Sequence, residues 1–268
     1  MNNIAVHSCE FVVQKYMNIP ETCYLGKRVY KKLFRENAKL SATDKKALSD
    51  DVDTILWQYT FKPTTIPIQP YEDDEREYHE VVLLQVNLTQ DKRVNRLCEI
   101  IHRAIPYPLI LVFHISNDQS SINNQKCLIN LAYKRFSQAE KDAIVAEGFQ
   151  ATGWLDLSNP TENQAAFLDS LDISTWPHTH FFAFYRAAME RVIALACAEH
   201  SGHYSLEIPN GLSVDDRVNK LKQVEKFQQE KSEIQGKLKK EKNLGTQVQL
   251  NTRIKQITDH IKAVKSEL

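Results

Sequence analysis

The chain has 268 residues, 42% of them hydrophobic, and its 34 basic and 34 acidic residues give a formal net charge of zero at pH 7. This suffices for one substantial domain with an appendage. The five cysteines are scattered without a CxxC pair, which argues against a disulfide framework or a zinc ribbon. No signal peptide is visible, and no apolar run, such as residues 109–113, is long enough to cross a bilayer. We therefore expect a cytoplasmic protein with reduced thiols that does not enter a membrane.

The N-terminal part predicts three helices. Residues 4–17 and 28–37 are short amphipathic candidates. Ser41 can cap a longer helix, which Pro63 should end near Phe61. The apolar side of this third helix follows helical spacing at Leu48, Val52, Ile55, Leu56 and Tyr59.

A proline-broken and then acidic stretch comes next. Residues 66–68 predict a short edge strand, and the charged run at residues 72–77 follows. Carboxylates here could serve a metal-dependent nuclease, because such sites need two or three carboxylates around a divalent ion. The candidates for this alternative are Asp73, Asp74, Glu75 and Glu80. The strands expected after them carry no carboxylate, so an exposed loop is the simpler interpretation.

The middle of the chain predicts a small sheet. Residues 79–88 alternate as a strand, with Val82, Leu84, Val86 and Leu88 on one face. A helix with the stripe Val94, Leu97, Cys98 and Ile101 leads to a continuous apolar strand at residues 109–115. This order predicts a right-handed crossover, and residues 125–133 predict a third strand that forms a hairpin with the second.

Two local patterns flank these strands. Ile105-Pro106-Tyr107-Pro108 should rigidify the entry to the central strand, and Tyr107 is a candidate for a peptide- or base-stacking surface. Further on, Ser137 with Glu140 resembles a capping box and predicts a short helix closed by Gly148. Residues 149–155 predict a fourth strand.

Histidines flank a long helix that should begin at Pro177 and end near Gly202. They form two pairs, His178 with His180 and His200 with His203. The two pairs stand about 30 Å apart on such a helix, so they cannot share a metal ion, and capping or surface roles are favoured. His114 on the central strand is interpreted as a core histidine, and Cys98 and Cys127 as packing thiols. No nucleotide, metal or nucleophile motif is present in the sequence, so we expect no cofactor.

The last quarter of the chain predicts an α-helical hairpin, an antiparallel coiled coil. Ser213 caps its first helix, residues 243–245 break it, and Thr246 with Gln249 resembles a second capping box. The second helix carries a seam with the 4-3-4-3-4 spacing of a coiled coil at Leu250, Ile254, Ile257, Ile261, Val264 and Leu268. The first helix has a gap in its apolar stripe between Phe227 and Ile234, so part of this seam is a candidate partner-binding or self-association surface.

The predicted fold class is thus α+β: a small mixed sheet covered by helices in residues 1–212, followed by the hairpin in residues 213–268. From Val214 onward 13 Lys and Arg stand against 8 Asp and Glu, so this part carries +5 and the rest −5. Nucleic-acid contact is therefore a further hypothesis. Its candidate residues are Lys237, Lys239, Lys240, Lys242, Arg253 and Lys255.

Several segments resemble the bacterial and archaeal family known as domain of unknown function 4391. They are Tyr24-Leu25-Gly26-Lys27-Arg28-Val29-Tyr30-Lys31-Lys32-Leu33-Phe34, Ile55-Leu56-Trp57-Gln58-Tyr59, Ile105-Pro106-Tyr107-Pro108 and the closing hairpin. The resemblance brings no activity and no catalytic residues. It implies a setting beside helicases and DNA methyltransferases of restriction-like and phage-defence systems. Our leading hypothesis is therefore a non-enzymatic accessory or scaffold protein that binds a helicase or methyltransferase subunit or a second copy of itself.

Overall fold

The computed structural model describes residues 15–115, 126–140, 143–208 and 212–268. The chain divides into two compact units, Met1–Val192 and Ile193–Leu268, with the boundary inside helix α6 (Phe181–Ser201). The predicted division into a body of residues 1–212 and a hairpin of residues 213–268 stays a prediction. Within the described residues, no helix combines the length and the apolar character that a membrane span requires.

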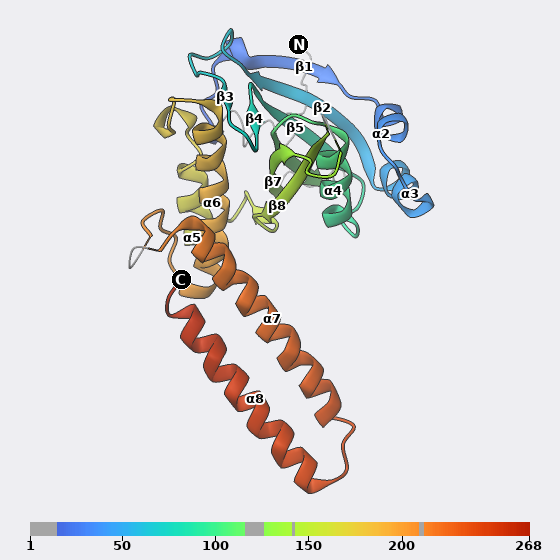
Figure 1. Cartoon of the computed structure of the whole chain (residues 1–268), viewed down its shortest axis with the longest axis vertical. Helices are drawn as coiled ribbons and strands as arrows, with labels where there is room; N and C mark the ends of the chain where they lie inside the picture. The colour runs from blue at the N-terminus through green and yellow to red at the C-terminus, as the bar shows by residue number, and fades with distance from the viewer. Residues whose placement is uncertain (1–14, 116–125, 141–142, 209–211) are drawn as a thin grey trace. The chain divides into compact units, whose positions relative to one another are not determined.

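A seven-stranded mixed sheet forms the centre of the first unit (Figure 1). The strand order is β1-β2-β5-β6-β7-β8, and β9 pairs with β7. All neighbours are antiparallel except β5 and β6, which are parallel and joined by α4, as the predicted crossover requires. The strands are β1 (Tyr24–Arg28), β2 (Val52–Phe61), β5 (Val81–Leu88), β6 (Leu109–Ile115), β7 (Lys126–Phe136), β8 (Ile144–Ala151) and β9 (Leu155–Asp156).

Helices cover both faces of this sheet. One face packs in a single apolar cluster with α2 (Lys31–Asn37), α3 (Ala42–Asp50) and α4 (Val94–Ala104), and Val82, Leu84, Val86 and Leu88 all belong to it, as predicted. On the other face lies the start of α6, where Phe184 packs against Phe61 with ring centroids 5.3 Å apart. The buried Tyr185 hydroxyl accepts the N–H of Ala132 at 3.0 Å, and its one proton is shared between the carbonyl oxygens of Leu109 on β6 and Ala132 on β7, at 2.9 and 2.8 Å.

Shorter elements complete the unit. They are a small hairpin of β3 (Tyr71–Glu72) and β4 (Glu77–Tyr78), the helix α5 (Glu162–Asp169), and the 3₁₀ turns η1 (Glu21–Cys23) and η2 (Ile173–Thr175). The sequence did not predict these elements or β1. Most of the predicted helix at residues 4–17 lies outside the described residues.

The prediction of one helix from Ser41 to Phe61 was wrong. Ser41 does cap α3 through a capping box with Asp44, but the helix ends at Asp50 and β2 begins at Val52. Residues 52–61 are rich in β-branched and aromatic side chains, which favour a strand, and both neighbours β1 and β5 pair with it. The apolar spacing also fitted a helix, and pairing across the sheet decided between the two.

Four local predictions also need correction. Residues 66–68 form no strand, although Ile66 and Ile68 are buried. The described residues after Ser137 form no helix: the Ser137 hydroxyl accepts the Glu140 N–H at 3.1 Å, as an N-cap would, but the Ser137 N–H bonds the Ala143 carbonyl oxygen at 2.7 Å and strand β8 begins at Ile144. The strand expected at 149–155 is split between the end of β8 and β9. Finally, α6 begins at Phe181 rather than Pro177.

The second unit contains the predicted helical hairpin. Ser213 caps α7 (Val214–Leu238), as predicted, and it does so through a capping box with Asp216. The cap of α8 (Leu244–Lys265) is Asn243 rather than Thr246, because the Asn243 side chain accepts the Thr246 N–H at 3.1 Å. Contacts between the two helices fix an antiparallel arrangement: Lys220 with Glu267, Phe227 with His260, and Glu230 with Arg253. The predicted fold class is therefore confirmed.

Candidate functional site

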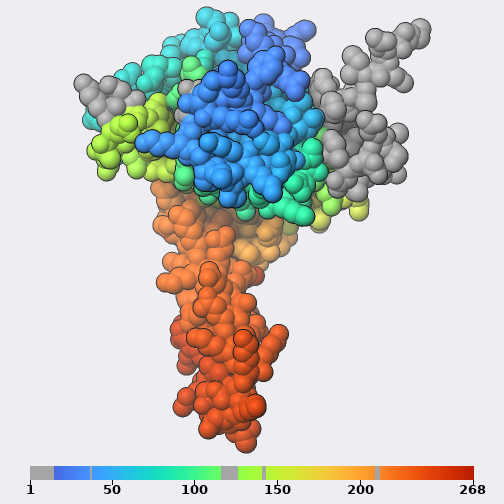
Figure 2. All heavy atoms as spheres, turned by 90° about the vertical axis from the view of Figure 1, so that its right-hand side faces the viewer, coloured from blue at the N-terminus to red at the C-terminus, as the bar shows by residue number. Residues whose placement is uncertain are grey.

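Exposed apolar side chains gather in a groove of about 770 Å³ at one edge of the sheet. It is bounded by β1, α2, Trp57 of β2 and residues 104–107, which follow α4. Figure 2 shows the N-terminal segment with β1 and α2, in blue, at the surface. We call this feature the docking groove; it is lined by Leu25, Lys27, Arg28, Val29, Tyr30, Lys32, Leu33, Glu36, Trp57, Ala104, Ile105, Pro106 and Tyr107.

One side of the docking groove is the edge strand β1. Its pairing with β2 is interrupted by a bulge between Tyr24 and Lys27. Gly26 lies in this bulge at φ +62, and a Cβ there would stand 2.5 Å from the Tyr24 hydroxyl oxygen. Glycine is therefore required for the Tyr24 ring to lie across the strand. Because a bulge disrupts the hydrogen-bonding edge, we expect a ligand to use the side chains of the groove rather than extend the sheet.

The opposite side is the segment that follows α4, and a buried lysine holds it in place. Lys134 on β7 is 2% exposed, and its Nζ donates to the carbonyl oxygens of His102 and, at 2.7 Å, Ile105. These carbonyls belong to the C-terminal end of α4, where a positive charge is favourable. The Tyr107 ring then meets Trp57 edge-on, with centroids 5.9 Å apart. The predicted rigidity of the Ile-Pro-Tyr-Pro segment thus has a hydrogen-bonded support.

Burial perturbs the titration of the groups behind this segment. Burial lowers the pKa of Lys134 to about 7. It also lowers the pKa of His102 to about 3, with the neighbouring Lys134 charge as a further cause. The neutral His102 ring bonds Asn130 Oδ1 at 2.9 Å through Nε2, and its buried Nδ1 has no hydrogen-bond partner among the described residues. These groups therefore support the groove from behind.

The lining of the docking groove is apolar and open to solvent. Tyr30 is 70% exposed, Leu33 43%, Tyr107 42% and Leu25 39%. Single exposed apolar residues are ordinary on a protein surface, but several around one concavity are typical of a site that another molecule covers. The exposed apolar area is thus concentrated where the surface is concave.

Positive charge borders the groove. Lys32 is paired with Glu36, the acidic residue of the lining, at 3.4 Å. No carboxylate of the described residues forms an ion pair with Lys27 or Arg28. The groove therefore presents two uncompensated positive charges beside its apolar surface.

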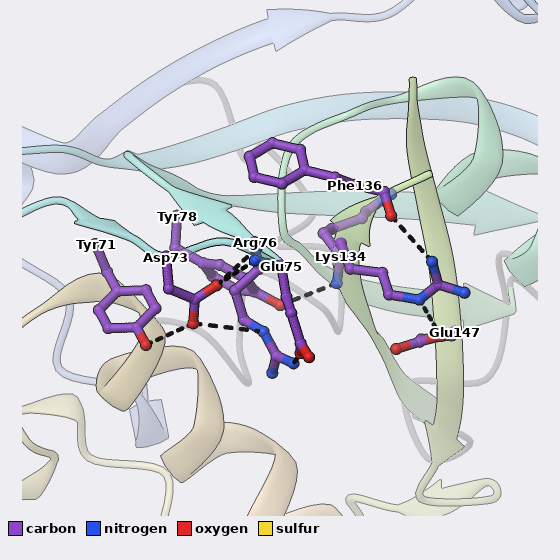
Figure 3. A network of polar contacts seen from close by, with 9 residues as sticks. Tyr71, Asp73, Glu75, Arg76, Tyr78, Lys134, Phe136 and Glu147 are labelled. Atoms are coloured by element: carbon purple, nitrogen blue, oxygen red, sulfur yellow. Dashed lines mark hydrogen bonds and ion pairs between the residues drawn. The ribbon is translucent and has the colours of Figure 1, made fainter. Parts of the chain in front are cut away.

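The carboxylates considered for a nuclease lie in and beside the β3–β4 turn (Figure 3). Asp73 accepts the N–H groups of Glu75 and Arg76 at 2.8 and 2.7 Å and the Tyr71 hydroxyl at 2.7 Å. Asp73 thus shapes the turn, and these bonds lower its pKa, with the Tyr71 bond the largest cause. Burial raises the pKa of Glu80. In the described parts of the chain, no three His, Cys, Asp or Glu side chains are grouped so as to hold a metal ion.

The seam residues of the hairpin are all at least partly buried. Ile257 and Leu268 are buried, and Leu250, Ile254, Ile261 and Val264 are half-buried on a helix that packs along α7. The exposed large apolar side chains of α8 are instead Leu244 (78%) and Val248 (65%).

Of the candidate nucleic-acid residues, Arg253 pairs with Glu230 at 2.7 Å. The others, Lys237, Lys239, Lys240, Lys242 and Lys255, are exposed.

The histidines before α6, His114 and the thiols of Cys98 and Cys127 take structural positions. His180 Nδ1 accepts the Ala183 N–H at 3.1 Å at the start of α6, and His178 contacts the Ile173 carbonyl oxygen at 3.0 Å. His114 is buried, with Nδ1 3.2 Å from the Lys126 carbonyl oxygen. Burial raises the pKa of both Cys98 and Cys127 to about 12, so these thiols are neutral.

Sequence reasoning missed the docking groove as a whole, together with Lys134 and His102. The signal for one side was present in the two prolines around Tyr107. The other side needed the correct assignment of β1 and β2, because only strand pairing brings residues 24–33 next to Trp57.

No curated protein and no solved structure matches this chain. A family model described as Domain of unknown function (DUF4391) matches residues 17–261, nearly the whole chain, and this span includes every residue of the docking groove. The chain belongs to this family, DUF4391.

Proposed function

We propose that this protein is an accessory or scaffold protein that acts through protein–protein contacts, with the docking groove as the surface that receives a partner. The observation that carries the proposal is the exposure of Leu25, Tyr30, Leu33 and Tyr107 around one concavity. Covering apolar surface is favourable by about 25 cal/mol per Å². Aromatic side chains at the centre of such a contact often dominate the binding energy.

The chemistry of the groove defines its partner. Apolar side chains should fill the space between Leu33 and Tyr107, and acidic side chains should face Lys27 and Arg28. The occupant is therefore an apolar segment with acidic flanks. The family resemblance implies a DNA-processing or phage-defence setting, so a helicase or methyltransferase subunit is the first partner to test.

Site-specific photo-crosslinking in the native host tests this proposal. A photoreactive amino acid replaces Tyr30, and mass spectrometry identifies the segment to which it is joined. We expect one defined partner segment with apolar and acidic residues, and its yield should fall when Lys27 and Arg28 are both changed to Glu. The same reagent at Val248 reports on the hairpin. A defined crosslink at Val248 with none at Tyr30 would reject the groove in favour of the hairpin.

Nucleic-acid binding by the hairpin is a second candidate function. Lys237, Lys239, Lys240 and Lys242 are exposed around the turn between α7 and α8. Clustered lysines bind phosphates without reading sequence, and such binding weakens steeply with salt.

The nuclease alternative predicts DNA cleavage with Mg²⁺ or Mn²⁺ that is lost on changing the exposed Asp74 and Glu75 to Asn and Gln. Unchanged DNA would reject it.

A further inference from the structure

A second, smaller concavity lies within the unit Ile193–Leu268. It has a volume of about 300 Å³, at the lower end of the range typical of small-ligand pockets. The end of α6, the loop after it and α7 all contribute. Its lining consists of Ala194, Cys197, Ser201, His203, Ser205, Glu207, Ile208, Arg217 and Leu268.

Arg217 is the unusual member of this lining. It lies in the first turn of α7 and is 4% exposed. Two of its donors bond carbonyl oxygens of the loop, Nη1 to Ser205 at 3.2 Å and Nη2 to Glu207 at 2.6 Å. Its Nε is buried without a hydrogen-bond partner among the described residues.

The charge of Arg217 is also uncompensated. No carboxylate of the described residues forms an ion pair with it, and the exposed Glu207 contributes a carbonyl oxygen instead. Burial raises the pKa of Cys197, so this thiol is neutral at pH 7 and supplies no negative charge. A buried guanidinium with neutral acceptors alone is costly, and an unmet N–H adds to the cost.

An oxyanion bound in the pocket would supply both the missing hydrogen-bond acceptor and the missing negative charge. It would accept the Nε–H and neutralise the buried charge, and charge-assisted bonds of this kind are the strong ones. Ser205 offers a hydroxyl donor, since its Oγ already accepts the Glu207 N–H at 3.1 Å and its own proton is available. A purely structural role for Arg217 in fastening the loop explains the two carbonyl bonds but not the unmet Nε.

We propose that this pocket binds an oxyanion, the phosphate or carboxylate group of a small ligand, with Arg217 as the principal contact and Ser205 as a second donor. This site is separate from the docking groove and does not depend on the proposed scaffold function.

Titration calorimetry on the full-length chain tests the proposal, with inorganic phosphate and acetate as probes and chloride at matched ionic strength as the reference. We expect saturable binding of at least one probe in the millimolar range. Arg217→Met should weaken it at least tenfold, and Ser205→Ala should weaken it severalfold without removing the buried charge. Lys222→Met, which removes an exposed charge from the same helix, is the matched control and should leave the Kd within about twofold.

Thermal unfolding gives an independent readout. The probe that binds should raise the Tm of the wild type and of Lys222→Met but not of Arg217→Met. Which of phosphate and acetate is effective identifies the oxyanion. The proposal is overturned if neither probe binds saturably, if Arg217→Met binds as the wild type does, or if Lys222→Met loses binding equally. Should Arg217→Met fail to fold, unchanged affinity in Ser205→Ala would overturn it.

Discussion

Replacing Lys134 by Met tests how the docking groove is supported. The substitution keeps the length of the side chain but removes its titrating group and its two bonds to the carbonyl oxygens of His102 and Ile105. Two acceptors at the end of α4 then lose a donor, which costs about 1–3 kcal/mol for each one that stays buried. At a pH where Lys134 is charged, the wild type also bears the cost of burying an ammonium group. The Met variant avoids this cost, which partly offsets its loss of the two hydrogen bonds.

The balance between these effects depends on pH. Burial lowers the pKa of Lys134 from 10.5 to about 7 in the folded protein. Between these two values the unfolded chain binds a proton that the folded chain has released, so the free energy of unfolding rises with pH. Each pH unit contributes at most ~1.4 kcal/mol, which sets an upper bound of roughly 5 kcal/mol over the whole interval. Below about pH 7 both states are protonated and this contribution is constant.

Urea unfolding of wild type and Lys134→Met from about pH 6 to about pH 10 measures the effect. The stability advantage of the wild type should be smallest near pH 6 and grow above pH 7, because titrating groups that do not interact with Lys134 cancel in the difference and His102 is neutral in the folded protein throughout this range. Lys126→Met removes an exposed lysine from the same strand and should show no such trend. A wild-type advantage that stays flat or falls between pH 7 and pH 10 would refute the assignment of Lys134 as the buried support.

Three further predictions concern other parts of the fold. Gly26→Ala should cost about 1–2 kcal/mol and displace the Tyr24 ring, because position 26 has φ +62 and no space for a Cβ; urea unfolding and Tyr24 ring signals in NMR measure this. Arg96→Met should cost about 1–3 kcal/mol near pH 7, because it removes both bonds to the buried Asp44 at 2.7 and 2.8 Å. The Arg96 side chain holds the pKa of Asp44 well below its usual range of about 4, so this difference should begin to shrink as the pH falls below about 4 and should be lost only when the pH passes the depressed pKa of the folded state; a constant difference would contradict it. Changing Lys237, Lys239, Lys240 and Lys242 to Gln should flatten the salt dependence of any DNA binding measured by fluorescence anisotropy, whereas an unchanged slope would exclude the hairpin turn.

Much of the fold follows from local sequence signals. The caps at Ser41 and Ser213, the alternation in β5 and the strand–helix–strand crossover are set by residues close together in the chain. The failures occurred where distant partners decide the structure. Residues 52–61 fit both a helix and a strand by apolar spacing, and β1 on one side and β5 on the other select the strand.

The candidate site was less predictable for the same reason. Residues 24–33, Trp57 and residues 104–107 are separated in the chain and meet only through strand pairing and the crossover. Lys134 gave no signal, because a lysine on a strand is normally exposed and its burial depends on the end of α4 lying above it. The proline-flanked Tyr107 was the one recognisable part.

The distribution of ionisable groups supports docking over catalysis in this groove. Catalytic groups with perturbed pKa values usually face the cleft in which the substrate binds. Here burial lowers the pKa values of Lys134, His102 and Lys31, yet none of the three lines the docking groove, and Lys134 is engaged with backbone carbonyls behind it. The side chains that do face the groove are apolar or are exposed Lys, Arg and Glu36, and Glu36 is paired with Lys32, so Lys27 and Arg28 suit recognition of an apolar, acidic segment. The buried polar residues of this region thus fix the shape of the surface, and under the proposed function the apolar residues would contact the partner.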